Sequence, residues 1–340
     1  RVAVARVVSR DRDGDASANV GWLGRVEVAG EAQDRATHLA ASGPETGPLL
    51  QPHGLGPLRR HDLSGPLGLD PAHEDGATPG SNLEPAVVDV QDLPRRPAGT
   101  EVFAVVATAG TTNLGIVDDI DGVADACTSA GVWLHIDGAY GGAAMAAPSV
   151  RHRFAGIQRA DSLVVDPHKW LFSPFDCAAL VYADPSLARA AHTQHAGYLE
   201  PIIDDTVWNP CDYANVLTRR ARGVPFWFSL AVHGTDAYTD AIEHTLEVTR
   251  ATRDMVEAAE HLELLVEPEL SVVAFRRRGW GSDDYQAWCD RLLAAGTALL
   301  TPTTFDGGAA MRICIVNPRT SVSDLQEVLA TLEPAGDPVT

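Results

Sequence analysis

Three short apolar runs in the middle of the chain each lead directly into polar and glycine-rich residues. They cover residues 103–107, 132–136 and 162–165. Unbroken apolar runs of this length, bounded by turn residues, are typical of strands buried on both faces, as in parallel sheets. Residues 117–127 begin with acidic side chains, continue with apolar residues at helical spacing, and precede Gly131, a helix stop. The order strand, helix, strand predicts a βαβ unit.

The apolar pattern continues toward the C-terminus with further helices and strands. We expect strands over residues 178–182, 270–276 and 312–316, and helices over 226–244, over 245–261, near 283–295 and from Ser323 onward. Ser323 and Gln326 fit a capping box at the start of that last helix. These elements predict a large α/β domain followed by a smaller α+β domain, with the boundary near residue 240.

Polar residues that could bind a ligand or take part in catalysis follow the three predicted strands. Asp137 directly follows an apolar run, and Thr111 and Lys169 each come four residues after one. Because ligands of open α/β sheets bind beyond the carboxyl ends of the strands, we expect these side chains at one edge of the sheet. Each also has an ordinary explanation, since such residues commonly cap turns or bond to the backbone. Their joint arrangement on neighbouring strand ends favours a shared site.

Lys169 is the one lysine among 340 residues, and the other strongly basic side chains are arginines. A guanidinium stays protonated and cannot form an imine, whereas a lysine amine can form a Schiff base with an aldehyde. Asp137 offers a carboxylate for a heteroaromatic nitrogen, a pairing typical of enzymes that use pyridoxal 5'-phosphate (PLP). His168 can transfer protons near neutral pH, and the hydroxyls of Thr111 and Thr112 suit a phosphate or phenolate oxygen. The alternative is a surface lysine left by drift in composition.

Three blocks of the chain, residues 108–115, 135–142 and 160–170, resemble the group II PLP-dependent amino acid decarboxylases in order and spacing. This family includes the aromatic-L-amino-acid, tyrosine, histidine and glutamate decarboxylases. The similarity continues in residues 175–177, 217–222 and 311–320, so that it covers about residues 80 to 335. The resemblance implies an α/β fold, the aspartate aminotransferase-like fold type I of PLP-dependent transferases. That fold has a mostly parallel sheet flanked by helices and a small α+β C-terminal domain.

The resemblance also implies roles for individual residues. It makes Lys169 the catalytic lysine that holds the cofactor as a Schiff base and Asp137 the partner of the pyridine nitrogen. His168 would be a catalytic residue beside the cofactor, Thr111 would contact the cofactor, and Ala139 would pack against its ring. No metal ligand is expected.

The family also has a small polar residue near the phosphate and a tyrosine on a mobile loop that acts as a proton donor. Asp166 occupies the first position, although an ionised carboxylate cannot donate a hydrogen bond to phosphate. The loop should fall between residues 197 and 217, which contain Tyr198 and Tyr213. Tyr213 fits the spacing better because it lies closer to the arginine-rich block, and we take it as the catalytic tyrosine.

By resemblance, the chain would decarboxylate an L-amino acid, a small-molecule substrate, to an amine and carbon dioxide, as a homodimer. The arginine-rich, aromatic block of residues 219–228 favours an aromatic substrate. One alternative is a related PLP enzyme that cleaves a carbon–carbon bond or forms an aldehyde. Another is a non-catalytic, truncated or frame-shifted paralogue that cannot hold the phosphate.

Residues 1–80 differ from the rest of the chain. They contain no Phe or Tyr and one Trp, Trp22, among many Gly, Pro, Arg and Asp residues. We expect a disordered or non-native segment there, because such a composition buries little apolar area. The family's Ser/Gly phosphate turn and ring-stacking histidine are not recognisable in it. The expected domains are therefore 81–240, a PLP-binding domain incomplete at its N-terminal side, and 241–335, the small C-terminal domain.

The overall charge and composition argue against several classes of binding partner. A net charge of −20 argues against nucleic acid and anionic membrane surfaces. No segment approaches the roughly 20 apolar residues of a membrane span, and no signal peptide is evident. The five cysteines show no metal-like or paired spacing. We therefore expect a cytoplasmic protein that binds neither nucleic acid nor membrane.

Overall fold

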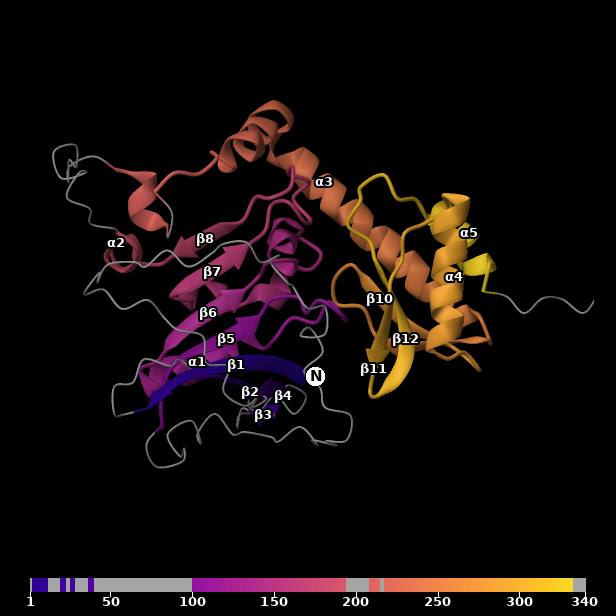
Figure 1. Cartoon of the computed structure of the whole chain (residues 1–340), viewed down its shortest axis with the longest axis horizontal. Coiled ribbons are helices and arrows are strands. Elements are labelled where there is room, and N and C mark those ends of the chain that lie inside the picture. The colour runs from indigo at the N-terminus through magenta and orange to yellow at the C-terminus, as the bar shows by residue number, and fades with distance from the viewer. Residues whose placement is uncertain are drawn as a thin grey trace, which may run out of the picture.

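A computed structural model of the chain describes residues 2–11, 19–22, 25–27, 36–39, 100–193, 208–214 and 217–332. These residues form two sheets, with the long helix α3 (Gly223–Ala258) running from the loops of the first to the second (Figure 1). The first sheet has the order β3-β4-β1-β5-β6-β7-β8, and β2 pairs with β1. Its strands are β1 (Val2–Asp11), β2 (Asn19–Trp22), β3 (Arg25–Glu27), β4 (Ala36–Leu39), β5 (Thr100–Thr108), β6 (Trp133–Asp137), β7 (Ser162–Val165) and β8 (Ala179–Tyr182).

The three predicted central strands are confirmed as β5, β6 and β7. They are parallel, and Thr108 and Val164 are the register partners of Asp137 on either side. The carboxyl ends of the three strands therefore meet at one edge, as predicted. Strand β8 joins β7 in the antiparallel direction, as β1 joins β5, so the described sheet is mixed around a parallel centre.

Alternation along the central strands separates a packed face from a more open one. Leu134 and Ile136 of β6 are buried in the main hydrophobic cluster, together with Ile120 and Val123 of helix α1 (Ile120–Ala130). This helix is the predicted crossover between β5 and β6, and it ends at Gly131 as expected. The side chains on the other face of β6, including Asp137, are half-buried. The sheet thus exposes its candidate carboxylate on the face opposite α1.

Helix α3 differs from the two helices predicted for its region. The break expected between residues 244 and 245 is absent, and the one non-helical residue within α3 is Gly234, with φ 77° and ψ 164°. The reason is local: residues 244 and 245 are His and Thr, which a helix accommodates, whereas glycine readily adopts positive φ. Ile242 and Leu246 pack into the first hydrophobic cluster.

The second sheet forms the C-terminal part of the molecule. It is antiparallel, in the order β11-β12-β10-β9, and it contains the predicted strands near residues 270–276 and 312–316. Its elements are β9 (Leu262–Val266), β10 (Val272–Arg277), α4 (Ser282–Ala295), β11 (Pro302–Phe305), β12 (Gly308–Cys314) and α5 (Val322–Ala330). A second hydrophobic cluster fills it and includes Val248 and Val256 of α3.

The start of α5 corrects the predicted capping box. The N-cap is Ser321 rather than Ser323, and its partner is Asp324 rather than Gln326. The Asp324 side chain accepts a hydrogen bond from the Ser321 N–H at 2.8 Å, and the Ser321 hydroxyl accepts one from the Asp324 N–H at 3.3 Å. The usual motif has Glu or Gln at this position. Asp324 has a shorter side chain and does not match that pattern, so the prediction missed it.

Some predictions fall largely outside the described residues. Of residues 1–80 the structure describes the four strands β1 to β4, so the expectation of a disordered or non-native segment stays a prediction. The domain limits 81–240 and 241–335 are also predictions, and α3 passes through residue 240. Among the described helices none is both long and apolar enough to cross a membrane. The same part of the chain holds no group of three or more potential metal ligands.

Candidate active site

The end of β6 places Asp137 beside two neighbouring turns. Its main-chain oxygen accepts a hydrogen bond from the Ala109 N–H at 2.8 Å, and one of its carboxylate oxygens accepts one from the Ala139 N–H at 3.1 Å. The carboxylate is therefore fixed by the turn that follows it. Within that fixed geometry the side chain stays half-buried on the open face of the sheet.

Ala139 connects the Asp137 turn to the turn that carries the lysine. Its carbonyl oxygen accepts a hydrogen bond from the Asp166 N–H at 3.1 Å. Asp166 is the first residue after β7, and Lys169 follows three residues later. One backbone hydrogen bond thus joins the segments bearing the predicted carboxylate and the predicted amine.

The Lys169 amine forms an ion pair with Asp166. Its Nζ lies 2.8 Å from the Asp166 Oδ2, and the Lys169 N–H donates to the Asp166 carbonyl at 2.9 Å. The lysine side chain is 42% exposed and that of Asp166 13% exposed. Asp166 therefore holds the lysine end in place, a contact that sequence reasoning did not identify because it placed this residue near the phosphate.

His168 is oriented by the loop that precedes β8. Its Nδ1 lies 2.6 Å from the Cys177 carbonyl oxygen, and its ring meets Phe175 edge-on at 5.1 Å. Because a carbonyl can only accept, Nδ1 carries the hydrogen. In the neutral tautomer with this hydrogen, Nε2 is the acceptor nitrogen.

Thr111 belongs to the turn after β5. Its hydroxyl oxygen accepts a hydrogen bond from the Ile116 N–H at 3.2 Å, and its own N–H donates to the Ile116 carbonyl at 2.9 Å. The hydroxyl is therefore partly used in its own turn, as the ordinary explanation of this threonine expected. Its hydrogen can still be donated to a ligand.

The predicted catalytic tyrosines are not placed at these turns by any described contact. Tyr213 ends the short 3-10 helix Pro210–Tyr213, where its ring stacks on Trp208 at 6.0 Å. Tyr198 lies outside the described residues. The choice between these two residues stays a prediction.

Several neighbouring residues were not assigned a role from the sequence. Tyr140 stacks on Trp170 with ring centroids 5.3 Å apart and an interplanar angle of 10°. Arg312 of β12 donates to the Thr112 carbonyl at 2.9 Å, next to Thr111. The quoted sequence blocks contain all of these residues, but their partners lie far along the chain and no spacing rule links them.

Charge and burial set the protonation of groups around the turns. Burial lowers the pKa of His135, on the same face of β6 as Asp137, although the Asp137 charge opposes that effect. Hydrogen bonding from Arg222, with a further contribution from Arg220, holds the pKa of Asp176 well below its usual range. These ion pairs connect the segment after Lys169 to the start of α3.

The described donor set fits the ring end of PLP. Lys169 offers the amine that an aldehyde requires, Asp137 a carboxylate for the ring nitrogen, and Thr111 a hydroxyl, all on turns at one edge of the sheet. Ala139, between the two turns, has a side chain small enough to lie against a flat ring. The phosphate turn and the stacking histidine were expected within residues 1–80, most of which lie outside the described part of the chain.

Comparison with known proteins gives a consistent pattern. A family model described as "Pyridoxal-dependent decarboxylase conserved domain" matches residues 71–278. The aromatic-L-amino-acid decarboxylase of Bacillus atrophaeus is 29% identical over 255 residues, covering 72% of this chain and 53% of that protein. The L-2,4-diaminobutyrate decarboxylase of Acinetobacter baumannii is 31% identical over 260 residues, covering 73% and 51%.

A solved structure shares the same architecture. The crystal structure of Oryza sativa TDC with PLP and tryptamine matches with a TM-score of 0.61 and 25% identity, covering 67% of this chain and 49% of that one. The match confirms the predicted fold class. The chain spans about half the length of the curated relatives that it matches.

Proposed function

The chain belongs to the pyridoxal-dependent decarboxylase family, and from that premise we propose that it takes part in PLP-dependent decarboxylation of an L-amino acid. The products would be the amine and carbon dioxide. The observation that carries the proposal is the Ala139–Asp166 hydrogen bond, which joins the turn of Asp137 to the turn of the lone lysine. A surface lysine without a function would not require a hydrogen bond between these two turns.

When bound, PLP supplies an aldehyde that a lysine amine can hold and a ring that accepts an electron pair from the substrate. Lys169 would hold the aldehyde end and Asp137 would keep a proton on the ring nitrogen. Ala139 would lie against the ring and Thr111 would donate its hydroxyl hydrogen to the cofactor. These roles rest on the family pattern and on the turns described above.

The surrounding side chains would orient and transfer protons. Asp166 would orient the Lys169 amine through their ion pair, and its position near the phosphate remains part of the proposal. His168, with Nε2 as an acceptor, would exchange a proton at the substrate. Tyr213 would donate a proton to the α-carbon of the substrate after carbon dioxide leaves, and Tyr198 is the alternative donor.

An aromatic amino acid is our preferred substrate, on the basis of the aromatic block near the start of α3. The relatives act on chemically different amino acids, since one is an aromatic-amino-acid and another a diaminobutyrate decarboxylase. We also propose a cytoplasmic homodimer, as the family resemblance implies. A panel of aromatic, basic and acidic amino acids therefore has to be compared directly.

The lone lysine allows a direct test. The protein is incubated with PLP, reduced with borohydride and digested, and the peptides are analysed by mass spectrometry. We expect a pyridoxyl group on Lys169, and no such group within the chain of Lys169→Ala. Lys169→Arg is the matched control, because it keeps the charge opposite Asp166 but cannot form an imine.

Product analysis separates the remaining functions. Carbon dioxide together with an amine supports the proposed decarboxylase, whereas an aldehyde product indicates the aldehyde-forming alternative. Absence of both the Lys169 label and carbon dioxide in the wild-type protein would favour the non-catalytic paralogue.

A further inference from the structure

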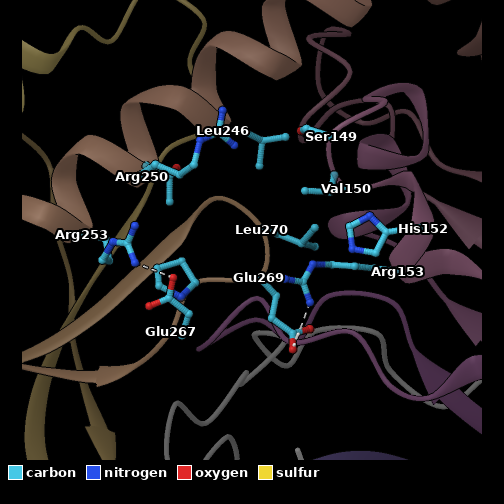
Figure 2. A pocket seen from close by; sticks show the side chains of 12 residues that line it. Ser149, Val150, His152, Arg153, Leu246, Arg250, Arg253, Glu267, Glu269 and Leu270 are labelled. Carbon is cyan, nitrogen blue, oxygen red and sulfur yellow. Dashed lines mark hydrogen bonds and ion pairs between the residues drawn. The ribbon is translucent and has the colours of Figure 1, made fainter.

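The segment Glu267–Ser271 connects β9 to β10 and lies against the loops of the first sheet. Two ion pairs fix its charged residues: Glu267 with Arg253 of α3 at 2.8 Å, and Glu269 with Arg153 at 3.4 Å. Figure 2 shows these two pairs on different sides of a pocket of about 210 Å³. Glu269 is buried and also accepts a hydrogen bond from the Val117 N–H at 3.0 Å. The segment is therefore tied to both α3 and the first sheet.

The last two residues of this segment reach the turns of the candidate site. Leu270 is buried in the first hydrophobic cluster and lies close to Gly110 and Gly141, which belong to the turns after β5 and β6. The Ser271 N–H donates to the Tyr140 hydroxyl at 3.1 Å, and the two hydroxyl oxygens lie 2.5 Å apart. Ser271 is fully buried, and the Tyr140 hydroxyl satisfies its N–H away from water, while the Cys314 thiol is a further hydrogen-bonding neighbour of both hydroxyls.

Tyr140 extends this connection to the lysine turn. Its ring stacks on Trp170, which directly follows Lys169 in the chain. Trp170 is fully buried, and its indole N–H donates to the Thr245 hydroxyl of α3 at 3.0 Å. Tyr140 itself lies three residues after Asp137. One aromatic pair thus joins the neighbours of both proposed cofactor-binding residues.

We propose that Tyr140 is a positioning residue that aligns the Asp137 and Lys169 turns, using Ser271 as its anchor. This inference rests on the proposed function. Tyr140 acts through its neighbours, because its hydroxyl is engaged by Ser271 and its ring by Trp170. Without the hydroxyl, the buried Ser271 N–H loses its acceptor and the stacked ring loses its anchor. Small displacements of groups that hold a cofactor weaken binding and turnover.

The test is Tyr140→Phe in the full chain, with Tyr285→Phe as the matched control. Tyr285 is also buried, and its hydroxyl accepts the Arg277 N–H at 2.7 Å, but it lies in the second hydrophobic cluster. We expect both variants to unfold at somewhat lower temperature. Only Tyr140→Phe should weaken PLP binding, by about tenfold, as the loss of one buried hydrogen bond predicts. Its kcat should fall while KM changes little.

A second variant guards against loss of folding. Ser271→Ala removes the hydroxyl partner and keeps the N–H donor, so we expect a smaller loss of PLP affinity in the same direction. Equal PLP affinity in wild type, Tyr140→Phe and Ser271→Ala would overturn the positioning role. If the wild-type protein fails to take PLP on Lys169, the proposed function itself fails, and the two results are thereby distinguished.

Discussion

Gly141 lies where the turn after β6 comes closest to the turn after β5. A Cβ atom at this position would meet the backbone of Ala109 and would lie 2.6 Å from the Leu270 Cδ1. Backbone atoms cannot move aside as a flexible side chain can. The close approach of the two turns therefore depends on the absence of a side chain at residue 141.

We predict that Gly141→Ala lowers the free energy of unfolding by about 1–3 kcal/mol, the usual cost of overpacking. Urea unfolding monitored by circular dichroism measures the change. Gly223→Ala is the matched control, since a Cβ there meets nothing within 4 Å and alanine favours a helix. Comparable stability of Gly141→Ala and wild type would show that the two turns do not need this contact.

At the residue scale, sequence reasoning found the strand-end residues and missed their connections. Asp137 and Lys169 could be placed because each follows an apolar run in a parallel unit. The ion pair of Lys169 with Asp166 is local, yet the resemblance directed attention to the phosphate instead. The Tyr140–Ser271 contact joins residues 131 positions apart, and no pattern in one sequence encodes such a pairing.

The N-terminal cap of helix α5 makes the stability of the protein depend on pH. Hydrogen bonds from the Ser321 N–H and from its side chain lower the pKa of Asp324. A carboxyl whose folded-state pKa is below its unfolded value stabilises the protein above that unfolded value, about 3.9 for aspartate. The stabilisation is lost as the pH falls through the folded pKa.

We therefore predict that Asp324→Asn is less stable than wild type near neutral pH and that the difference shrinks on acidification to about pH 3. Urea unfolding at both pH values gives the comparison. Glu327→Gln, at an exposed position on the same helix, is the matched control. A difference that stays constant across this range would rule out the charged cap as its source.

At the element scale, the prediction succeeded where characteristic residues occur at both ends of a helix. Helix α1 has acidic residues at its start and Gly131 at its end, and the structure reproduces it closely. Helix α3 was divided at the wrong place because nothing in the sequence between residues 244 and 245 distinguishes one helix from two. Its actual break, at Gly234, uses a residue that helices often tolerate without breaking.

The whole molecule carries a large excess of negative charge, with 46 acidic residues against 26 Lys and Arg residues. Such an excess destabilises a compact state through self-repulsion. Dissolved salt screens this repulsion over about 10 Å at 0.1 M ionic strength. The described ion pairs, such as those of Arg253 and Arg159, oppose it only locally.

We predict that the unfolding temperature rises when NaCl is increased from about 10 mM to about 500 mM at neutral pH. Differential scanning fluorimetry measures it, and KCl in place of NaCl separates screening from effects of a particular ion. A fall in the unfolding temperature with both salts would mean that the attractive ion pairs outweigh the repulsion.

At the scale of the whole molecule, the sequence indicated two sheet-containing parts, and the structure adds how they are joined. The apolar runs predicted strands in each part, because burial leaves a local pattern. The joining segment Glu267–Ser271 begins with two glutamates around a proline, and its last two residues were predicted as the start of the next strand. This segment joins the two parts through ion pairs with Arg253 of α3 and with Arg153 beside the first sheet, and these residues come together only in the folded chain.

The length of α3 is as constrained as its composition. Ile242 and Leu246 pack into one hydrophobic cluster, and Val248 and Val256, two and ten residues after Leu246, pack into the other. Adding or deleting one residue between them would rotate everything downstream by about 100° and shift it by about 1.5 Å. The anchoring valines would then face solvent. Natural variants of this protein should therefore tolerate exchanges along this stretch of helix far better than insertions or deletions.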